Sequence, residues 1–403
     1  MSKNGMDRRA FMKSSLAGVG SFFFLPTNGG ELGLRAQGEK PGEKKILHRA
    51  LGKTGLKLPP VNMGVMNSDN PNLVRAALNG GMVMLDTAQT YQRGTNEAMI
   101  GEVLKGRPRD SFVLATKSRL PNDQKTGLYL PEATEEAYSK KIDTSLRNLG
   151  LDHVDIYYHH NVWARDSALY EPILNALVKA KKAGKTRFIG IATHRNEPEV
   201  IYAAIDSKVY DVVLTTYNFK QKHYPEVRSA MAKASEAGLG VVVMKALGGR
   251  QLQEGSKEPI DSKAALKWAL QDPNTHTIIA GFTTFDQMNL NFAVMEDPVL
   301  TRPEKAGLQR GTMMAGLYCQ GCGQCLSRCV QALPIPDLMR AYMYVYGYRN
   351  LVEAQELVTS LKLPLKVCED CDSCAVSCAI GFRVRDRIRN IVRLREVPKE
   401  FIV

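Results

Sequence analysis

The sequence predicts an α/β protein, a (β/α)8 TIM barrel followed by a small C-terminal domain. Short apolar runs typical of strands alternate with amphipathic runs typical of helices over most of residues 46–302, and eight such repeats close a parallel barrel. All eight cysteines lie beyond residue 318, which sets the C-terminal part apart from the barrel. A length of 403 residues accommodates a barrel of roughly 250 residues and a second domain.

The N-terminal residues resemble an export signal. The segment DRRAFMK, residues 7–13, precedes a modest apolar run over 14–26 that is too short to span a bilayer. The paired arginines resemble a twin-arginine signal, which implies passage of the folded protein through the twin-arginine export machinery into a bacterial periplasm. A disordered basic tail is the alternative. We expect a signal peptide over 1–36, a linker over 37–45 and no stable membrane span in the mature form.

The barrel is expected over residues 46–302. It opens with two short apolar segments around a Gly-Lys-Thr-Gly turn, a pattern typical of a hairpin. A doubly wound open sheet is the structural alternative, but no Gly-x-Gly-x-x-Gly follows any predicted strand. The predicted strands are 61–65, 82–85, 112–116, 154–158, 188–192, 212–215, 241–244 and 277–280, and the predicted helices are 95–104, 134–149, 170–183, 197–205, 224–237, 261–270 and 284–292.

Four ionisable side chains lie at the ends of three successive predicted strands. Asp86 and Tyr91 follow the second strand, Lys117 follows the third and His160 follows the fourth, and barrel enzymes place their catalytic groups at these ends. Reduction of a carbonyl by hydride needs a proton donor, and tyrosine has a reference pKa of about 10. A buried ammonium such as that of Lys117, held by the Asp86 carboxylate, would stabilise the phenolate and lower that pKa. Each residue alone also fits a structural role, as a helix cap, a surface lysine or a core imidazole.

The stretch GMVMLDTAQTYQRGTNEAMIG contains the pattern D-T-A-x-x-Y-x-x-G-x-x-E-x-x-x-G and resembles the aldo-keto reductases. The resemblance implies an enzyme that interconverts a carbonyl and an alcohol by hydride transfer. It implies that Tyr91 is the proton donor and that Lys117 and Asp86 tune it. The family histidine falls five residues after the aspartate of its strand, which selects His160 over His159 as the group that orients the substrate oxygen.

The resemblance also implies a nicotinamide cofactor, NAD or NADP. Leu214 stands where the family has a glutamine, and Met244 stands where a tyrosine stacks on the nicotinamide. Gly281 and Gln287 fall where a lysine and an arginine bind the 2′-phosphate of NADP, so a preference for NADP is not expected. A glycine loop flanked by cations is typical of a phosphate site, although a plain tight turn is the alternative. The expected cofactor residues are Thr193, His194, Lys245, Leu247, Gly248, Gly249, Arg250 and Asn291.

The cysteines repeat one spacing, C-x2-C-x2-C-x3-C, twice. This is the spacing of two-cluster bacterial ferredoxins, in which the fourth cysteine of each motif usually binds the other cluster. Four disulfides, or two zinc sites with four cysteine ligands each, are the alternatives. We expect two 4Fe-4S clusters in a ferredoxin-type domain over 303–403, an arrangement that resembles a subgroup of the aldo-keto reductases. The expected ligands are Cys319, Cys322, Cys325, Cys329, Cys368, Cys371, Cys374 and Cys378.

The same C-terminal region contains three predicted helices. The first two cover 336–348, with a run of tyrosines assigned to packing, and 350–361. The third follows Cys378, and its apolar stripe opposite four arginines is typical of an amphipathic helix with a solvated polar face. The four arginines are Arg383, Arg385, Arg387 and Arg389.

The formal charge of +13 favours anionic partners, but no nucleic-acid motif accompanies it, and we expect no nucleic-acid partner. The expected partners are a small-molecule carbonyl or alcohol, bound near the 118–132 loop with Trp163 and Arg165, and a redox partner protein. Free nicotinamide cofactor is not expected outside the cytoplasm, so an exported enzyme would hold it tightly or use the clusters. One alternative is an electron-transfer or redox-sensing protein on a catalytically degenerate barrel, and another is clusters with a purely structural role.

Overall fold

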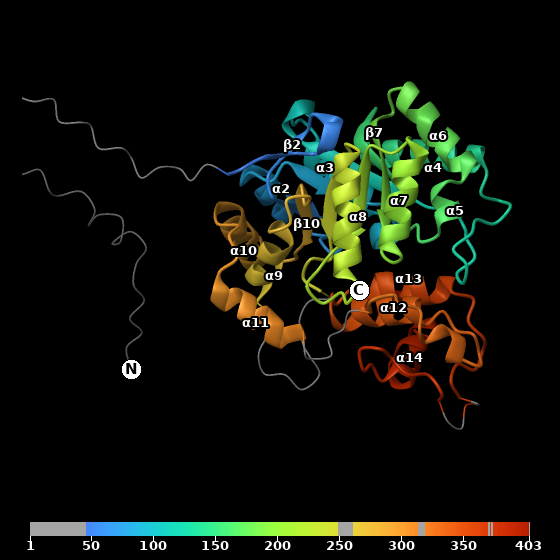
Figure 1. The fold of residues 1–403 in the computed structure, drawn as a ribbon. Coiled ribbons are helices and arrows are strands. Elements are labelled where there is room, and N and C mark those ends of the chain that lie inside the picture. The colour runs from blue at the N-terminus through green and yellow to red at the C-terminus, as the bar shows by residue number, and fades with distance from the viewer. Residues whose placement is uncertain (1–45, 249–260, 313–318, 370, 372–373, 403) are drawn as a thin grey trace, which may run out of the picture. The chain divides into compact units, whose positions relative to one another are not determined.

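The computed structural model describes residues 46–248, 261–312, 319–369, 371 and 374–402. The predicted signal peptide and linker therefore lie outside the described residues. Eight parallel strands follow one another around a closed barrel, and the last strand pairs with the first (Figure 1). The predicted barrel is thus confirmed. Its strands are β3 (Val61–Gly64), β4 (Met84–Asp86), β5 (Val113–Ser118), β6 (Val154–His159), β7 (Thr186–Thr193), β8 (Val212–Thr216), β9 (Gly240–Met244) and β10 (Thr277–Gly281).

The strands are short apolar runs because both of their faces are buried. One set of side chains, including Met84, Ile156 and Leu214, fills the barrel interior, and a second set packs outward against the helices. A buried asparagine sets the register at the start of the barrel. The Asn62 Oδ1 atom accepts hydrogen bonds from the backbone N–H groups of Val83 and Met84, at 3.0 and 2.8 Å.

Helices connect successive strands and cover the outside of the barrel (Figure 1). Helix α4 is capped at both ends. The Thr134 hydroxyl accepts from the Ala137 N–H at 3.1 Å, and Gly150 ends the helix at a φ of 62°. The short helices α2 and α5 have no counterpart among the predicted ones. The barrel helices are α2 (Pro71–Asn79), α3 (Asn96–Leu104), α4 (Glu135–Leu149), α5 (Arg165–Ala168), α6 (Glu171–Lys182), α7 (Glu197–Ser207), α8 (Tyr224–Glu236), α9 (Ser262–Leu270) and α10 (Phe285–Glu296).

A hairpin closes the end of the barrel where the strands begin. Strands β1 (Arg49–Ala50) and β2 (Lys57–Leu58) pair antiparallel around the 3-10 turn η1 (Gly52–Thr54). Leu51 of this hairpin belongs to the same buried cluster as the interior side chains. Gly52 has a φ of 53°, and a Cβ atom there would lie 2.4 Å from the backbone nitrogen of Gly240, so only glycine fits. The opposite end is therefore the end left for chemistry.

The C-terminal segment is helical in its described part and has an apolar core of its own. This core joins the three helices α12, α13 and α14 through side chains such as Leu338, Val358 and Ile388. The helices lie against the barrel within one compact unit that starts at Lys45 (Figure 1). The helices of the segment are α11 (Arg302–Thr312), α12 (Ile335–Tyr346), α13 (Leu351–Ser360) and α14 (Val384–Val392), with 3-10 turns η4 (Leu326–Arg328), η5 (Arg393–Arg395) and η6 (Lys399–Phe401).

Polar contacts attach this C-terminal segment to loops at the ends of several barrel strands. Because the contacts reach the loops after β3, β4, β6, β7 and β8, the segment forms a cap over the mouth of the barrel. The contacts join Asn350 Nδ2 to Asn67 Oδ1 (2.9 Å), Arg93 Nη2 to Ile402 O (3.2 Å), Arg340 Nη1 to Asn161 Oδ1 (3.2 Å), Arg195 Nη1 to Asp337 Oδ2 (3.3 Å) and Gln320 Nε2 to Lys220 O (2.5 Å).

Of the four arginines predicted to form a solvated face on and beside α14, Arg387 is buried and Arg385 is half-buried, so the prediction is wrong for Arg387 and holds only in part for Arg385. Arg387 is buried and lies over the Phe382 ring, with its guanidinium carbon 3.9 Å from the ring centroid. Arg385 Nη2 donates to the carbonyl oxygen of Cys371 at 2.5 Å. Contacts with aromatic rings and with backbone carbonyl groups therefore offset the loss of hydration of these guanidinium groups.

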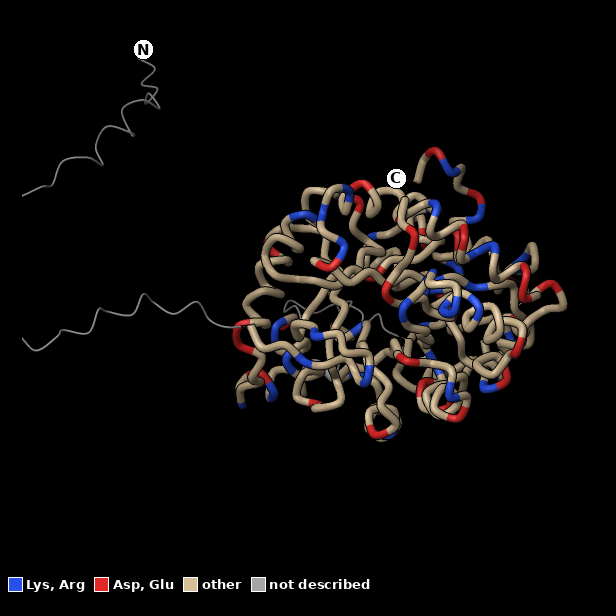
Figure 2. Tube along the Cα trace, turned by 90° about the horizontal axis from the view of Figure 1, so that it is seen from above, with Lys and Arg blue, Asp and Glu red and all other residues tan. Residues whose placement is uncertain are grey.

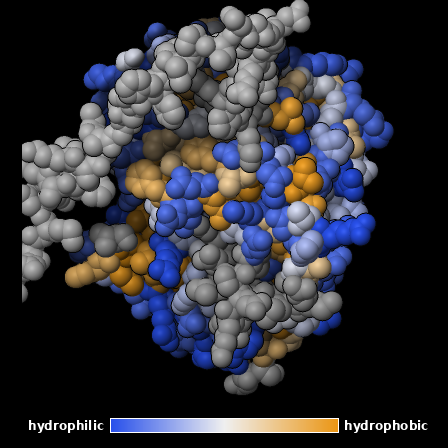
Figure 3. All heavy atoms as spheres, turned by 90° about the vertical axis from the view of Figure 1, so that its left-hand side faces the viewer, coloured by the Kyte–Doolittle hydropathy of each residue, from blue (hydrophilic) through white to orange (hydrophobic). Residues whose placement is uncertain are grey.

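Charged residues are distributed without a segregated pattern in the barrel and the cap. Figure 2 shows acidic and basic residues interspersed along the trace, and Figure 3 shows small apolar groups separated by hydrophilic residues on one face. In the part of the chain that the structure describes, no helix combines the length and the apolar character needed to cross a membrane.

Candidate functional site

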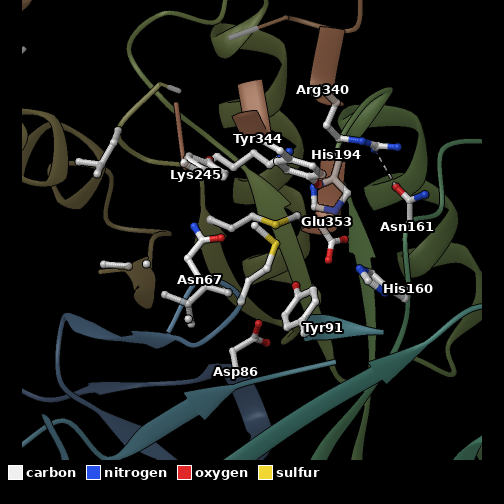
Figure 4. Close-up of a pocket in the computed structure, with 18 of the residues that line it drawn as sticks. Asn67, Asp86, Tyr91, His160, Asn161, His194, Lys245, Arg340, Tyr344 and Glu353 are labelled. Atoms are coloured by element: carbon white, nitrogen blue, oxygen red, sulfur yellow. Dashed lines mark hydrogen bonds between the residues drawn. The ribbon is translucent and has the colours of Figure 1, made fainter. Parts of the chain in front are cut away.

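A large pocket opens at the ends of the barrel strands, beneath the C-terminal cap (Figure 4). Its open volume is about 1280 Å³, including the mouth. Barrel residues form its floor and one wall, and cap residues form its roof. The floor includes Asp86, Tyr91 and His160, the wall includes His194, Met244 and Lys245, and the roof includes Arg340, Tyr344 and Glu353.

The structure brings the four predicted catalytic side chains together, with Asp86, Tyr91 and His160 on the floor of the pocket and Lys117 buried next to them. Lys117 Nζ forms an ion pair with Asp86 Oδ1 and donates to the carbonyl oxygen of Thr87 at 2.7 Å. The same ammonium lies beneath the Tyr91 ring, 5.0 Å from its centroid. The centroids of the Tyr91 and His160 rings are 6.3 Å apart, with the rings nearly perpendicular. Three successive strands and their loops thus place these four side chains next to one another.

The ion pair beneath Tyr91 is almost completely removed from water. The side chains of Asp86 and Lys117 are each 2% exposed. Burial raises the pKa of Asp86 and lowers the pKa of Lys117, while the attraction between the two charges acts against both shifts. Each charge therefore depends on the other, because an unpaired charge at this depth would be strongly disfavoured.

The electrostatic environment of Tyr91 differs from the expectation that Lys117 lowers its pKa. Burial raises the pKa of Tyr91 well above its usual value, and the negative charges of Asp86 and Glu353 raise it further. The phenol is therefore protonated at neutral pH, which is the form that a proton donor requires.

The backbone around Tyr91 is strained. Tyr91 begins the 3-10 turn η2 (Tyr91–Gly94), in which Gln92 and Arg93 adopt left-handed conformations with φ values of 51° and 55°. Such conformations cost roughly 1–2 kcal/mol each for residues other than glycine. The cap supports this turn, since Arg93 Nη2 donates to the carbonyl groups of Lys399 and Ile402 at 3.3 and 3.2 Å.

His160 is a neutral imidazole. Burial lowers its pKa well below the usual value, and the positive charges of Lys117, Arg119 and Arg340 act in the same direction. Among the described residues, its buried Nδ1 atom has no hydrogen-bond partner. A neutral ring at this place can donate an N–H group to a carbonyl oxygen without adding a charge.

The predicted cofactor residues divide between the pocket wall and its surroundings. His194, Lys245 and Leu247 line the pocket. Gly248 lies beside Lys220, while Thr193 and Asn291 donate to the backbone carbonyls of Arg195 (2.8 Å) and Gln287 (2.6 Å), and these three are not on the wall. Gly249 and Arg250 lie outside the described residues.

The wall formed by β9 and β10 is mainly apolar. Met244, Ile279 and Ala280 line it, and Lys245 contributes one amine. Burial, together with the positive charge of Arg340, lowers the pKa of Lys245 to about 7, and an anionic group bound beside this amine would favour its charged form. This wall can hold a flat ring against apolar side chains and a phosphate beside the amine.

Several pocket residues come from the cap and are not among the site residues that the sequence predicts. Arg340, Tyr344 and Tyr348 face the pocket from one side of α12 and its end. Their spacing of four residues was the available signal, since it places polar groups on one face of an otherwise apolar helix. The tyrosine run was assigned to packing instead, and two of its members line the pocket.

The predicted substrate-lining residues also differ in their placement. Arg119, in the 118–132 loop, lines the pocket. Trp163 packs beneath the Arg195 guanidinium, 4.0 Å from its ring centroid, away from the pocket wall. Arg165 forms an ion pair of 2.6 Å with Asp206, and both side chains are largely exposed.

The eight cysteines are all free thiols, and they gather in two groups of four. Each group combines three cysteines of one motif with the last cysteine of the other. Among the described residues, no three His, Cys, Asp or Glu side chains are arranged to hold a single metal ion. Cys319, Cys322, Cys325 and Cys378 line a hollow of about 410 Å³, and Cys329, Cys368, Cys371 and Cys374 line a hollow of about 420 Å³.

The first cysteine group lies beside the wall of the large pocket. A hollow of about 360 Å³ is lined by Cys319 and shares His194, Lys245 and Arg340 with that pocket. Burial raises the pKa of Cys319 to about 12, so this thiol becomes a thiolate only beside a strong positive charge. Cys319 thus lies on a hollow that adjoins the large pocket along these three shared residues.

Replacement of Gly321 by alanine should weaken the contact between the cysteine loop and the barrel. Gly321 has a φ of 66°, and a Cβ atom there would lie 2.8 Å from the Cβ atom of Arg195. Gly323 provides a matched control, because its φ is 72° and its Cβ atom would meet only the end of Leu326 at 3.6 Å. Both variants should lose about 1–2 kcal/mol of stability, because alanine is disfavoured in the left-handed conformation. Gly321→Ala should lose roughly 1–3 kcal/mol more, because its Cβ atom overlaps with Arg195.

Thermal unfolding of the two variants, measured side by side, checks this difference. An equal loss of stability in both would show that the loop does not press on Arg195.

Comparison with known proteins links the barrel to one family. A profile described as "Aldo/keto reductase family" matches residues 62–264, half of the chain. L-galactose dehydrogenase from Arabidopsis thaliana is 28% identical over 310 residues, which cover 67% of this chain and 92% of that protein. L-glyceraldehyde 3-phosphate reductase from Escherichia coli K12 is 27% identical over 166 residues, which cover 38% of this chain and 47% of that protein.

Solved structures show the same likeness. The holo form of an aldo-keto reductase from Bacillus halodurans superimposes with a TM-score of 0.54 at 25% identity, over 66% of this chain and 96% of that one. An aldo-keto reductase from Klebsiella pneumoniae, solved with NADPH, shares the fold with a TM-score of 0.52 at 20% identity, over 66% and 96% of the two chains. The family match ends at residue 264, so the cap lies outside it.

Proposed function

The chain belongs to the aldo/keto reductase family and is an oxidoreductase, and from this we propose that it interconverts a carbonyl and an alcohol by NAD(P)-dependent hydride transfer, with Tyr91 as the proton donor. The observation that supports this most directly is the convergence of Tyr91, His160 and the Lys117–Asp86 ion pair on the floor of one pocket. The same convergence argues against a barrel that serves only as a scaffold.

The chain's own residues account for the proton chemistry of the proposed reaction. His160, neutral and with an unpartnered ring nitrogen, would donate a hydrogen bond to the carbonyl oxygen and hold it near Tyr91. As hydride adds to the carbonyl carbon, negative charge develops on the oxygen, and the Tyr91 hydroxyl transfers its proton there. The Lys117 ammonium, 5.0 Å from the ring centroid, would then stabilise the phenolate. In the reverse direction Tyr91 accepts the proton.

The wall opposite Tyr91 fits a nicotinamide cofactor, which would supply or accept the hydride. The apolar side chains of Met244, Ile279 and Ala280 offer a surface for the ring, and Lys245 offers a cation for a phosphate. The NADPH named for the Klebsiella structure, which shares the fold, belongs to this class of cofactor. Gly281 and Gln287 supply no cation for a 2′-phosphate, so we propose no preference between NAD and NADP.

We further propose that the cysteines hold two 4Fe-4S clusters in a ferredoxin-type arrangement. Three observations support this: each motif has the ferredoxin spacing, the eight thiols form two groups of four, and each group exchanges its fourth cysteine with the other. Each thiolate binds a different iron atom of such a cluster, so the four ligands do not converge on one point. The observed geometry agrees with this. Among the described residues, the four thiols of each group surround a hollow, and no three of them are arranged to hold a single ion.

The position of Cys319 supports electron exchange between the first cluster and the active site, because His194, Lys245 and Arg340 are shared by the two adjoining hollows. The test is iron and acid-labile sulfide analysis of anaerobically purified protein, followed by titration with NADH and NADPH under spectroscopic observation. We expect about eight irons per chain and cluster bleaching on addition of a nicotinamide. Full iron content without bleaching would leave the clusters structural, and zinc in place of iron would remove them from the proposal.

The crossed arrangement makes a specific prediction for single cysteine variants. Cys378→Ser should disturb the cluster held by the first motif, although Cys378 belongs to the second motif in the sequence. Its iron content should fall by about half, since one of two four-iron clusters loses a ligand. Its electron paramagnetic resonance spectrum after reduction should resemble that of Cys322→Ser. A spectrum that instead matches Cys374→Ser would overturn the crossed ligation.

A further inference from the structure

The roof of the active-site pocket contains a carboxyl group that the proposed reaction does not use. We propose that Glu353, on helix α13 of the cap, binds a substrate hydroxyl group close to the reacting carbonyl, and that the enzyme thereby selects carbonyl compounds with a neighbouring hydroxyl group over those without one. The inference rests on the proposed function, since it assigns the substrate class of the same site.

Glu353 faces the same space as the catalytic floor. It lines the pocket together with Tyr91 and His160, and Figure 4 shows its carboxylate pointing into the pocket between Tyr344 and Tyr91. Helix α13 packs against the η2 turn that begins with Tyr91. Among the described residues, the Oε2 atom of Glu353 is buried and has no hydrogen-bond partner. A buried carboxyl oxygen of this kind is costly unless a ligand donates to it.

Glu353 is held in place from both sides. The Oδ1 atom of Asn350 accepts from the Glu353 backbone N–H at 3.0 Å, and the Nδ2 atom of the same asparagine donates to Asn67 on the barrel at 2.9 Å. Asn67 itself lines the pocket. The carboxyl group is therefore positioned by the helix N-terminus and by a barrel loop before any ligand arrives, which lowers the entropic cost of binding.

The groups around Glu353 suit a ligand that carries a hydroxyl group. Arg119 and Arg340 line the same pocket as Glu353, and Arg340 is already paired with Asp337. A hydroxyl group can donate to a carboxylate and at the same time accept from a guanidinium. The rings of Tyr344 and Tyr348, stacked at 5.9 Å, add an apolar surface for the carbon skeleton.

The protonation of Glu353 is consistent with this role. Burial, together with the negative charge of the neighbouring Glu356, raises its pKa to about 7, although Arg119, Arg340 and Lys117 act in the opposite direction. Near neutral pH the carboxyl group is therefore present in both forms, and it can accept or donate a hydrogen bond to a hydroxyl group.

The experiment compares two substrates and two enzymes. The full-length protein and its Glu353→Gln variant are assayed with glyceraldehyde, which has two hydroxyl groups beside the aldehyde, and with propanal, which has none. The kcat/KM for glyceraldehyde should fall by about 10- to 100-fold in the variant, as expected when a hydrogen bond to a charged group is lost. The value for propanal should change less than about threefold. For each substrate, the kcat/KM of the variant is divided by that of the wild type, so differences in hydration between the two aldehydes cancel.

Glu356→Gln is the matched control, because it removes the same charge from the same helix one turn away. If both variants lower kcat/KM for glyceraldehyde equally, the loss comes from the net charge at the roof and not from a contact with Glu353, and the inference is overturned. An equal loss for propanal and glyceraldehyde in Glu353→Gln would also overturn the inference.

A binding measurement separates this inference from the proposed function. Calorimetric titration of the wild type and Glu353→Gln with glycerol and with propan-1-ol requires no turnover. Weaker glycerol binding in the variant, with unchanged propan-1-ol binding, supports the inference even if no carbonyl is reduced. Equal glycerol binding by both proteins overturns it, even if both reduce aldehydes.

Discussion

Replacement of Tyr91 by phenylalanine should lower kcat/KM for carbonyl reduction by about 10²- to 10⁴-fold. The variant keeps the ring that packs against Lys117 but loses the hydroxyl group that would protonate the alkoxide. Because burial already keeps the phenol protonated, its loss removes the proposed proton donor and not a charge. Steady-state kinetics with a saturating nicotinamide cofactor, together with the thermal midpoint of unfolding, check the prediction.

Tyr202→Phe removes the same atom at an exposed position on the outer helix α7 and provides the control. It should leave both activity and stability unchanged. If Tyr91→Phe retains more than about a tenth of the wild-type kcat/KM, another group must donate the proton. The neighbouring Glu353 would then be the first candidate, and the Tyr91→Phe/Glu353→Gln double variant would test it.

Replacement of Lys117 by methionine should destabilise the protein by about 3–5 kcal/mol, because it leaves the Asp86 carboxyl buried without its partner. The variant also loses the cation near the Tyr91 ring, so its activity should fall as well. The free energy of unfolding, measured with urea by circular dichroism, checks the stability part.

The double variant Asp86→Leu/Lys117→Met separates the two roles of this ion pair. Replacing both charges with apolar side chains of similar volume should restore most of the lost stability, since the cost of burying an unpaired charge disappears. Activity should not return, because no cation remains beneath the Tyr91 ring where Lys117 now lies. Recovery of activity in the double variant would show that the pair serves only the fold.

The barrel could be predicted because its strands and helices each leave a pattern in neighbouring residues of the sequence. Strands buried on both faces appear as short apolar runs, and helices with one buried face repeat at 3.6 residues, so the order of elements is visible along the chain. All eight predicted strands are present within about two residues of their predicted ends. Asp86, Lys117 and His160 could be placed near one another for the same reason, since parallel strands finish at one end of the barrel.

The direction in which the protein shifts the pKa of Tyr91 could not be predicted in this way. It depends on how deeply the cap buries the phenol and on Glu353, which comes from a helix more than two hundred residues later in the chain. The burial of Arg387 against Phe382 is a similar case, because the amphipathic pattern of α14 contains no information about what packs on its polar side.

The sequence by itself determined the alternation that builds the barrel, the positions of the predicted catalytic side chains at its strand ends and the spacing of the two cysteine motifs. Only the tertiary structure decided that the cap covers the pocket and that Arg340, Tyr344 and Glu353 form its roof. It also decided that Cys329 lies with the first three cysteines of the second motif, and Cys378 with the first three of the first motif. The physical reason is the range of the interactions. Propensity and periodicity act over a few residues, whereas the roof and the cysteine groups depend on polar contacts between distant segments, such as Asn350 with Asn67.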